Sequence, residues 1–263
     1  MNRQKRFNAL LYLNGDAGSK RQLRRARLQG IHTHHIFSDE FEVMHKGSAE
    51  EAFAHIVDTA GRFDLYGIRG GDGSWANLFT AMHKLGIEAP IMSLGGGSGQ
   101  AHYTFTGVNT VEQGLESVVG GNIHEMDLLH VTSESTDPRV VFMSGFGGID
   151  ALMCALRKGR GYPGYIPASL KALFQHVPQT IHLKSSYVVN PETGAEGTLD
   201  WEFRDVNVCL ANTNPYWGKW SQMVPHARHT PGLAGFRVYS GRTRPELVGE
   251  FLRSHLGKVR PTH

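Results

Sequence analysis

Cysteine is scarce in this chain of 263 residues, which contains only Cys154 and Cys209. Two cysteines at that separation match neither a metal-binding spacing nor a disulfide framework, so we expect a reducing, cytoplasmic environment. No apolar run approaches the roughly 20 residues that span a bilayer. The basic start at residues 1–6 is followed by an apolar run that is too short for a signal peptide. We therefore expect any membrane contact to be peripheral.

A strong charge of either sign is also missing. The formal net charge is +3, which is too small to favour a nucleic-acid partner and would only permit contact with an anionic surface. Glycine, by contrast, is abundant, and its 32 residues indicate many tight turns. The content of 40% hydrophobic and 19% charged residues is typical of a globular protein with one large or two modest domains.

The first half of the chain alternates short apolar runs with helical patterns. We predict buried strands at residues 7–13, 64–68 and 89–94, and helices at residues 19–28, 49–57 and 75–85. Ser48 and Glu51 have the spacing of a helix-capping box, and Gly86 stands where a helix would end. Strands that alternate with helices in this way predict a parallel sheet in an α/β domain.

After about Gly121 the pattern changes to a succession of strands. We predict strands at residues 124–132, 139–144, 181–190, 199–211 and 236–239, with helices at residues 149–157 and 168–176. Thr243 and Glu246 form another capping box, with Pro245 in the first turn of a last helix. The sequence therefore predicts an α/β domain at residues 1–125 and an antiparallel, β-rich domain at residues 126–263.

Glycine-containing turns follow the three strands predicted in the first half. They lie at residues 14–18, 70–74 and 95–99. A glycine turn that opens a helix presents bare backbone N–H groups and the positive end of the helix dipole, which suits phosphate oxygens. Asp72 adds a carboxylate that could hold Mg²⁺ or orient a reacting group. The alternative is that the glycines only shape a strand–helix turn, with Asp72 or Ser74 as its cap.

Neither the P-loop lysine motif nor the dinucleotide fingerprint matches these turns. Gly70–Ser74 instead resembles Gly-Gly-Asp-Gly-Thr, the hallmark of the diacylglycerol kinase, sphingosine kinase and bacterial lipid kinase family. Asn14–Gly18 resembles the family's Asn-Pro-x-Ala/Ser-Gly, and Ser93–Gly99 resembles Pro-x-Gly-Thr-x-Asn-Asp. Phe142–Ala151 resembles a glycine turn that runs into Phe-Asp-Ala, and Ala211–Ala227 resembles Ala-Asn…Gly-Gly…Pro-x-Ala. The order and spacing of the motifs agree over about residues 7 to 257.

The resemblance implies an N-terminal α/β nucleotide-binding domain, a C-terminal β-sandwich for the lipid, and transfer of phosphate from ATP to a lipid hydroxyl with Mg²⁺ as cofactor. It implies a lipid at a membrane surface as partner and no nucleic acid, and a homodimer is compatible with it. Asp72 would be catalytic and would engage Mg²⁺. The nucleotide would be bound by Asn14, Gly70, Gly71, Gly73, Ser74, Gly95, Gly96, Gly97 and Ser98. NAD kinases share the fold and rank second, because they typically carry Asn-Glu where this chain has Gly99-Gln100.

The departures from the family pattern fall in the chemistry. The family's threonine is Gly96, its Asn-Asp is Ser98-Gly99, and Pro231 replaces the aspartate proposed as general base. Proline cannot accept a proton, and a general base typically contributes about 10²–10⁴-fold to the rate. His229 is the candidate replacement base, although a surface loop residue is the simpler interpretation. The chain also stops where relatives usually continue, which indicates a shortened C-terminal domain. The alternative function is a weak or silent relative that binds nucleotide or lipid.

Overall fold

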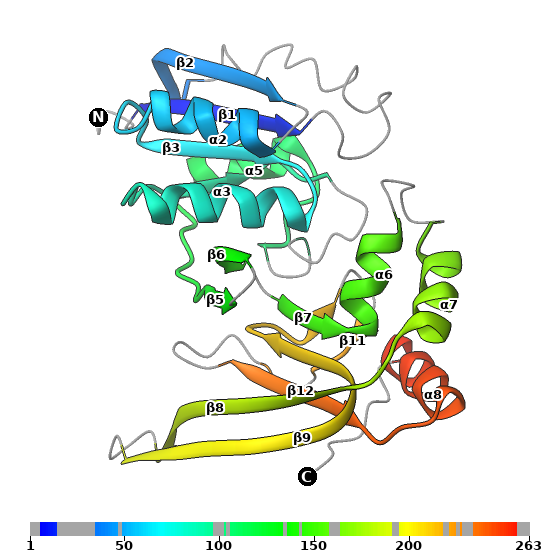
Figure 1. Ribbon diagram of the computed structural model, residues 1–263. Coiled ribbons are helices and arrows are strands. Elements are labelled where there is room, and N and C mark those ends of the chain that lie inside the picture. Colours follow the sequence, from blue (N-terminus) through cyan, green and yellow to red (C-terminus); the bar gives the residue numbers. More distant parts are fainter. Residues whose placement is uncertain are drawn as a thin grey trace. The chain divides into compact units, whose positions relative to one another are not determined.

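The computed structural model describes residues 6–14, 35–46, 49–96, 103, 106–133, 136–141, 144–157, 164–190, 195–217, 221–224, 227 and 234–256. The chain forms two compact units, shown in Figure 1. The first unit comprises Met1–Gly145 and Asn212–Ala234, and the second comprises Phe146–Ala211 and Gly235–His263. The functional division predicted between residues 125 and 126 stays a prediction.

A parallel sheet forms the centre of the first unit. Its strands are β1 (Phe7–Asn14), β2 (Phe37–Lys46), β3 (Leu65–Arg69) and β4 (Ile91–Ser93). Their order is β2-β1-β3-β4, and every neighbouring pair is parallel. Residues 9–13 of β1 are all buried, as expected for a central strand covered on both faces. The predicted parallel α/β sheet is confirmed.

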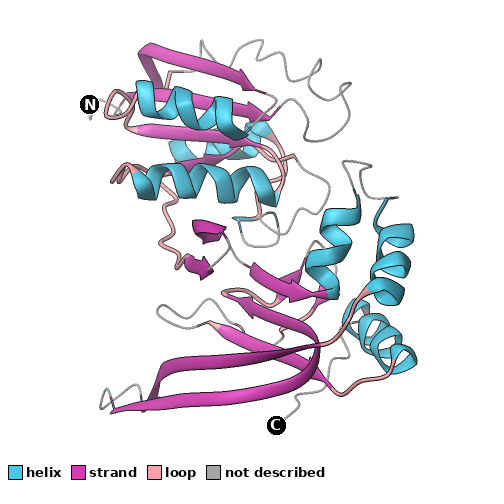
Figure 2. Cartoon of the chain, in the orientation of Figure 1, coloured by secondary structure: helices cyan, strands magenta, loops and turns pink. Residues whose placement is uncertain are grey.

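Helices cover both faces of this sheet (Figures 1 and 2). They are α2 (Ala49–Asp58), α3 (Asp72–Lys84) and α5 (Val111–Val119). Leu10 and Tyr12 of β1 belong to the core beneath α2 and α3, whereas Leu11 belongs to the core beneath α5. The strand thus sends alternate side chains to opposite faces, and each face buries an apolar core.

The predicted elements of this unit agree with the structure apart from their ends. The three predicted strands correspond to β1, β3 and β4, and Gly86 has φ +62° two residues beyond the end of α3. The sequence interpretation missed β2 and α5. The predicted helix at residues 19–28 and Ser48 lie outside the described residues.

Two small antiparallel pairs complete the first unit. One joins β5 (Leu129–Ser133) to β6 (Thr136–Val141), and the other joins β10 (Tyr216–Trp217) to β11 (Ser221–Gln222). The strand predicted at residues 124–132 therefore begins at Leu129, because residues 122–128 have no regular structure.

The second unit contains an antiparallel sheet and three helices. The strands are β7 (Ser144–Gly148), β8 (Gln179–Asn190), β9 (Ala195–Asn212) and β12 (Gly235–Ser240), with β9 between β12 and β7 and with β8 antiparallel to β9. The helices are α6 (Ile149–Arg157), α7 (Tyr165–Gln175) and α8 (Arg244–His255). The predicted antiparallel, β-rich second part is confirmed. Within the described ranges, no helix is long and apolar enough to cross a membrane.

Candidate functional site

The three strands that precede the glycine turns end side by side at the carboxyl edge of the parallel sheet. Leu13 of β1 pairs with Arg69 of β3, and Ile68 of β3 pairs with Ser93 of β4. The chain therefore leaves the sheet at neighbouring points after each strand. Ligands of open α/β sheets bind at this edge, outside the carboxyl ends of the strands.

The first glycine turn leads directly into α3. Gly71 is the N-cap in an extended conformation, with φ −84° and ψ 178°, and Asp72 begins the helix. Ser74 is buried and its backbone N–H donates to the carbonyl of Gly71 at 2.8 Å. A Cβ added at Gly73 would meet no atom of the described residues within 4 Å, so these residues leave the space beside the first turn open. The exposed N–H groups and dipole of this helix end are suited to an anion.

The second glycine turn lies against the first. Gly95 and Gly96 have φ of +68° and +97°, values that side chains disfavour. A Cβ added at Gly96 would lie 3.6 Å from the backbone nitrogen of Gly70. A Cβ added at Gly95 would lie 2.1 Å from the carbonyl oxygen of Asn109, just before α5. The turn therefore needs glycine to fit between the first turn and the start of α5.

Arg69, a residue that the sequence interpretation did not select, connects the two turns. Its Nη1 atom donates to the carbonyl of Leu94 at 2.8 Å. Burial lowers the pKa of the guanidinium, whereas the Glu112 carboxylate raises it. An arginine keeps its charge under such shifts, so a fixed cation lies between the turns. The signal in the sequence was a basic residue directly before the glycine turn.

The position of Arg69 accounts for one departure from the family motif. A Cβ added at Gly96 would lie 3.2 Å from Cγ of Arg69, closer than most Cβ contacts. The family's threonine at this position would therefore need a small shift of the arginine side chain, and it would also have to adopt a φ of +97° that side chains disfavour. Glycine at position 96 therefore suits both the backbone conformation of the turn and the neighbouring Arg69 side chain.

Glu112, in the first turn of α5, is the acidic group whose charge interacts with Arg69. Hydrogen bonds from its own backbone N–H and from the Thr110 hydroxyl lower the pKa of Glu112, and Arg69 lowers it further. Thr110 caps α5 and accepts from the backbone N–H of Gln113, whose side chain accepts from the Thr110 N–H at 3.1 Å. This local capping fixes the helix end that supports Gly95.

The remaining predicted site residues are less defined. Asn14 is the last residue of β1 and pairs with Lys46, which places its backbone at the same edge. Gly97, Ser98, His229 and Pro231 lie outside the described residues. Their roles stay predictions.

Asp72 is suited to a magnesium ion that arrives with a nucleotide. Across the described ranges, His, Cys, Asp and Glu form no group of three that could hold a metal ion. Mg²⁺ bound with phosphates usually needs only one or two protein carboxylates, because water and phosphate oxygens supply the rest. A single carboxylate in the first turn of a helix fits that requirement.

The fold combines a parallel sheet covered by helices with an antiparallel second part. Residues 8–131 match the family model of the diacylglycerol kinase catalytic domain. No curated protein matches the sequence.

Solved structures from Bacillus anthracis str. Sterne share the fold. A diacylglycerol kinase has 16% identity and a TM-score of 0.62, with 98% of this chain and 79% of that chain covered. A putative diacylglycerol kinase has 14% identity and a TM-score of 0.65, with 98% and 81% covered. At such identities the likeness concerns the fold alone.

Proposed function

We propose that the chain is an ATP-dependent lipid kinase that transfers the γ-phosphoryl group of ATP to a lipid hydroxyl. The observation that carries this proposal is the contact between two glycine turns beside α3, in a segment that matches a kinase family. Phosphoryl transfer depends mainly on positioning and charge stabilisation, which such an edge can provide. The proposed lipid is a membrane component, so the protein would act at the cytoplasmic membrane surface.

The proposed roles follow from the geometry at the sheet edge. Backbone N–H groups of Gly70, Gly71 and Gly73 would hold phosphate oxygens, assisted by Asn14 and Ser74 and by residues 95–98. Arg69 would hold the second turn in place and add positive charge. Mg²⁺, when bound, would neutralise charge on the phosphates. Asp72 would ligate this ion and orient the acceptor hydroxyl, and His229 is the candidate proton acceptor.

A specific observation also supports a second candidate, a silent module that binds nucleotide or lipid. Arg69 lies against Gly96, the position of the family's threonine, and the family's Asn-Asp and general base are replaced at Ser98, Gly99 and Pro231. A module of this kind would bind ATP without transferring phosphate.

Asp72→Asn should lower lipid phosphorylation by at least about 10²-fold, because it removes the charge that orients the metal ion and the acceptor. The measurement is radiolabelled ATP with mixed lipids, followed by lipid extraction and counting. Asp64→Asn is the matched control, since Asp64 precedes β3 at the opposite end of the same strand. Wild-type protein that binds ATP but yields no labelled lipid would reject the kinase in favour of the silent module.

Gly73→Val should weaken ATP binding by at least about tenfold while leaving the free energy of unfolding nearly unchanged. The branched side chain would enter open space in the protein but would obstruct a phosphate at the helix start. Calorimetric titration with ATP and thermal unfolding measure the two effects. Gly147→Val is the control, because a Cβ there also meets no atom within 4 Å. Unchanged ATP affinity in a folded Gly73→Val protein would show that phosphate binds elsewhere.

A further inference from the structure

An apolar stripe runs along the exposed side of α7. Ile166, Leu170 and Phe174 recur every four residues, with exposed fractions of 68%, 53% and 65%. Val177, just beyond the helix, is 72% exposed. The opposite side of α7 is buried in the protein through Ala168 and Ala172. Single exposed apolar residues are common in proteins, but a continuous stripe indicates an interaction surface.

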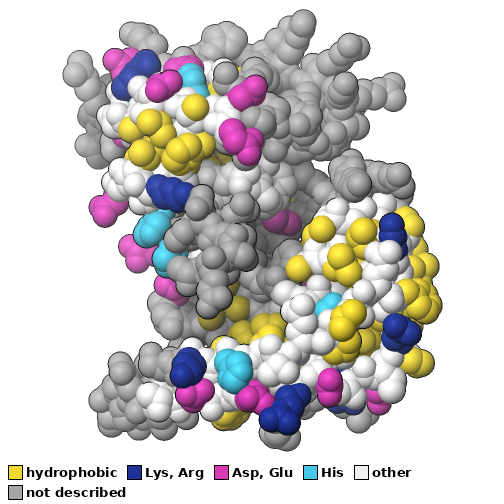
Figure 3. All heavy atoms as spheres, in the orientation of Figure 1, with side chains coloured by type: hydrophobic (Ala, Val, Ile, Leu, Met, Phe, Trp, Pro, Cys, Tyr) yellow, Lys and Arg dark blue, Asp and Glu magenta, His cyan; other side chains and the backbone are white. Residues whose placement is uncertain are grey.

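A second apolar row lies on α8. Val248, Leu252 and Leu256 are also spaced by four residues, with exposed fractions of 42%, 57% and 69%. Arg244 joins the helices, because its Nε and Nη2 atoms donate to the carbonyls of Leu173 and Phe174 at 3.1 and 3.4 Å. Its guanidinium lies 5.4 Å from the centre of the Phe174 ring. Figure 3 shows apolar side chains gathered over this part of the second unit. We name the seven residues Ile166, Leu170, Phe174, Val177, Val248, Leu252 and Leu256 the apolar face.

Positive charge exceeds negative charge around the apolar face. Residues 165–175 and 241–256 contain Lys171, Arg242, Arg244 and Arg253 against Glu246 and Glu250, an excess of two positive charges. Both carboxylates pair with arginines. Glu246 lies 3.8 Å from Arg242, and Glu250 pairs with Arg253 and, at 3.8 Å, with Arg237.

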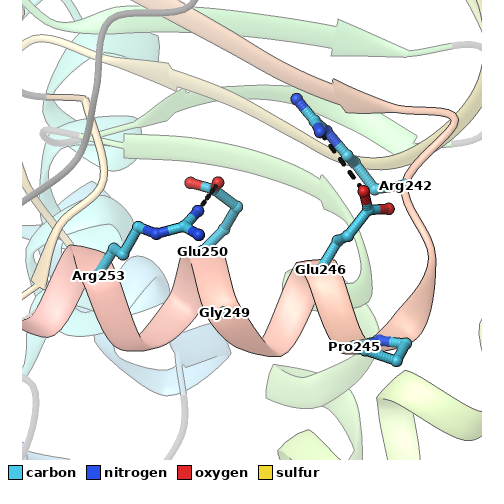
Figure 4. Close-up of a pocket in the computed structure, with 6 residues that line it drawn as sticks. All are labelled: Arg242, Pro245, Glu246, Gly249, Glu250 and Arg253. Carbon is cyan, nitrogen blue, oxygen red and sulfur yellow. Dashed lines mark hydrogen bonds and ion pairs between the residues drawn. The ribbon is translucent and has the colours of Figure 1, made fainter.

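These pairs line a polar cavity of about 350 Å³ along α8, shown in Figure 4. The dashed lines mark Arg242 with Glu246 and Arg253 with Glu250. Because each carboxylate in the cavity has a basic partner, we assign no ligand to it. Lys171 and Arg244, which have no carboxylate partner in these ranges, account for the excess positive charge near the apolar face.

We propose that the apolar face docks on an anionic lipid bilayer. The proposal rests on the proposed function, since a lipid substrate would lie in that bilayer. Helices with one apolar side and flanking basic residues lie in the plane of the membrane interface. Anionic lipids attract nearby Lys and Arg side chains, and α7 carries Lys171 without any acidic residue. A second copy of the chain would instead bring the same excess of positive charge together on both sides of the contact.

Sedimentation with vesicles tests the proposal. Wild-type protein should bind vesicles of equal parts phosphatidylcholine and phosphatidylglycerol. The double variant Ile166→Ser/Leu170→Ser should bind at least about tenfold more weakly, because it removes two exposed apolar side chains from the stripe. Ile123→Ser is the matched control, since Ile123 is 75% exposed in the first unit. Lys171→Glu should weaken binding to these vesicles but not to pure phosphatidylcholine.

Two results would overturn the docking proposal. One is equal vesicle binding by wild type and the double variant. The other is a wild-type dimer in sedimentation equilibrium that the double variant dissociates, which would make the apolar face a contact between copies of the chain. Phosphorylation of a short-chain lipid dispersed in detergent distinguishes a failure of the docking proposal from a failure of the proposed kinase function. The double variant should phosphorylate that lipid as wild type does, whereas a chain without kinase activity would phosphorylate it in neither form.

Discussion

Asp150→Asn should remove most of the pH dependence of stability between about pH 4 and pH 7. Over this range we expect the free energy of unfolding of the wild-type protein to fall by up to roughly 4 kcal/mol because of Asp150. Asp150 lies in the first turn of α6 and is only 6% exposed. Its Oδ2 atom is buried and has no hydrogen-bond partner among the residues that the structure describes. Burial raises the pKa of this carboxyl from its ordinary 3.8 to about 7. The folded protein therefore holds a proton that the unfolded chain releases at lower pH.

The direction of the effect follows from proton binding. Between pH 4 and 7 the native state binds more protons at Asp150 than the unfolded state, so the free energy of unfolding falls with rising pH. Below this window both states are protonated, and above it both are ionised, so the dependence stops at either end. The neighbouring Tyr239 does not add to it, because burial raises the pKa of Tyr239 to about 12.

Chemical denaturation at about pH 4, 6 and 8 measures the difference in unfolding free energy between wild type and Asp150→Asn. From pH 4 to pH 8, the free energy of unfolding of Asp150→Asn should rise relative to that of the wild type by up to roughly 4 kcal/mol. Asp200→Asn makes the same chemical change on a side chain that is 65% exposed in the same unit, and serves as the control. Parallel pH dependences for wild type and Asp150→Asn would contradict the prediction.

Gly95→Ala should destabilise the protein by about 2–5 kcal/mol, the sum of strain and overpacking. Gly95 has φ +68°, and an added Cβ would lie 2.1 Å from the carbonyl oxygen of Asn109 and 2.6 Å from its carbon. Both are backbone atoms fixed by the capped start of α5, so they cannot move aside as a side chain would. Thermal unfolding gives the loss of stability, and ATP titration of the folded fraction gives the effect on the turn.

Substitutions at two other glycines distinguish the effect of backbone strain from that of overpacking. Gly61→Ala imposes a positive φ of +81° without any atom within 4 Å, so it measures backbone strain alone. Gly148→Ala repeats the full collision, with φ +76° and 2.1 Å to the carbonyl oxygen of Asn207, in the second unit. We expect Gly148→Ala to match Gly95→Ala in stability but to spare ATP affinity. Equal destabilisation by Gly95→Ala and Gly61→Ala would mean that the contact with Asn109 is not tight.

Features that depend on a few successive residues could be predicted from the sequence. The continuous apolar run of β1 indicated a buried strand, and residues 9–13 are all buried. The capping box at Thr243 was predicted correctly, because the Glu246 carboxylate accepts from the Thr243 N–H and hydroxyl at 2.8 Å. Helix and strand propensity, capping and hydrophobic periodicity depend on residues close together in the sequence, so they can be recognised without knowing the fold.

Elements that depend on a distant partner were missed. β2 contains Ser38, Glu40 and Glu42, a polar composition that argues against a buried strand. It forms because it lies at the edge of the sheet and pairs with β1 alone, where polar side chains are tolerated. Asn8 supports this edge by accepting from the Ser38 hydroxyl at 2.5 Å, a contact across 30 residues.

The sequence by itself determined that glycine turns follow strands, and hence that a phosphate-binding edge was to be expected. Only the tertiary structure decided that Arg69 binds the Leu94 carbonyl and lies against Gly96, that Asp150 is buried, and that residues 212–234 belong to the first unit. Each of these depends on contacts between segments far apart in the chain. Local preferences do not specify such contacts, because they arise only when packed elements bring distant residues within a few ångströms.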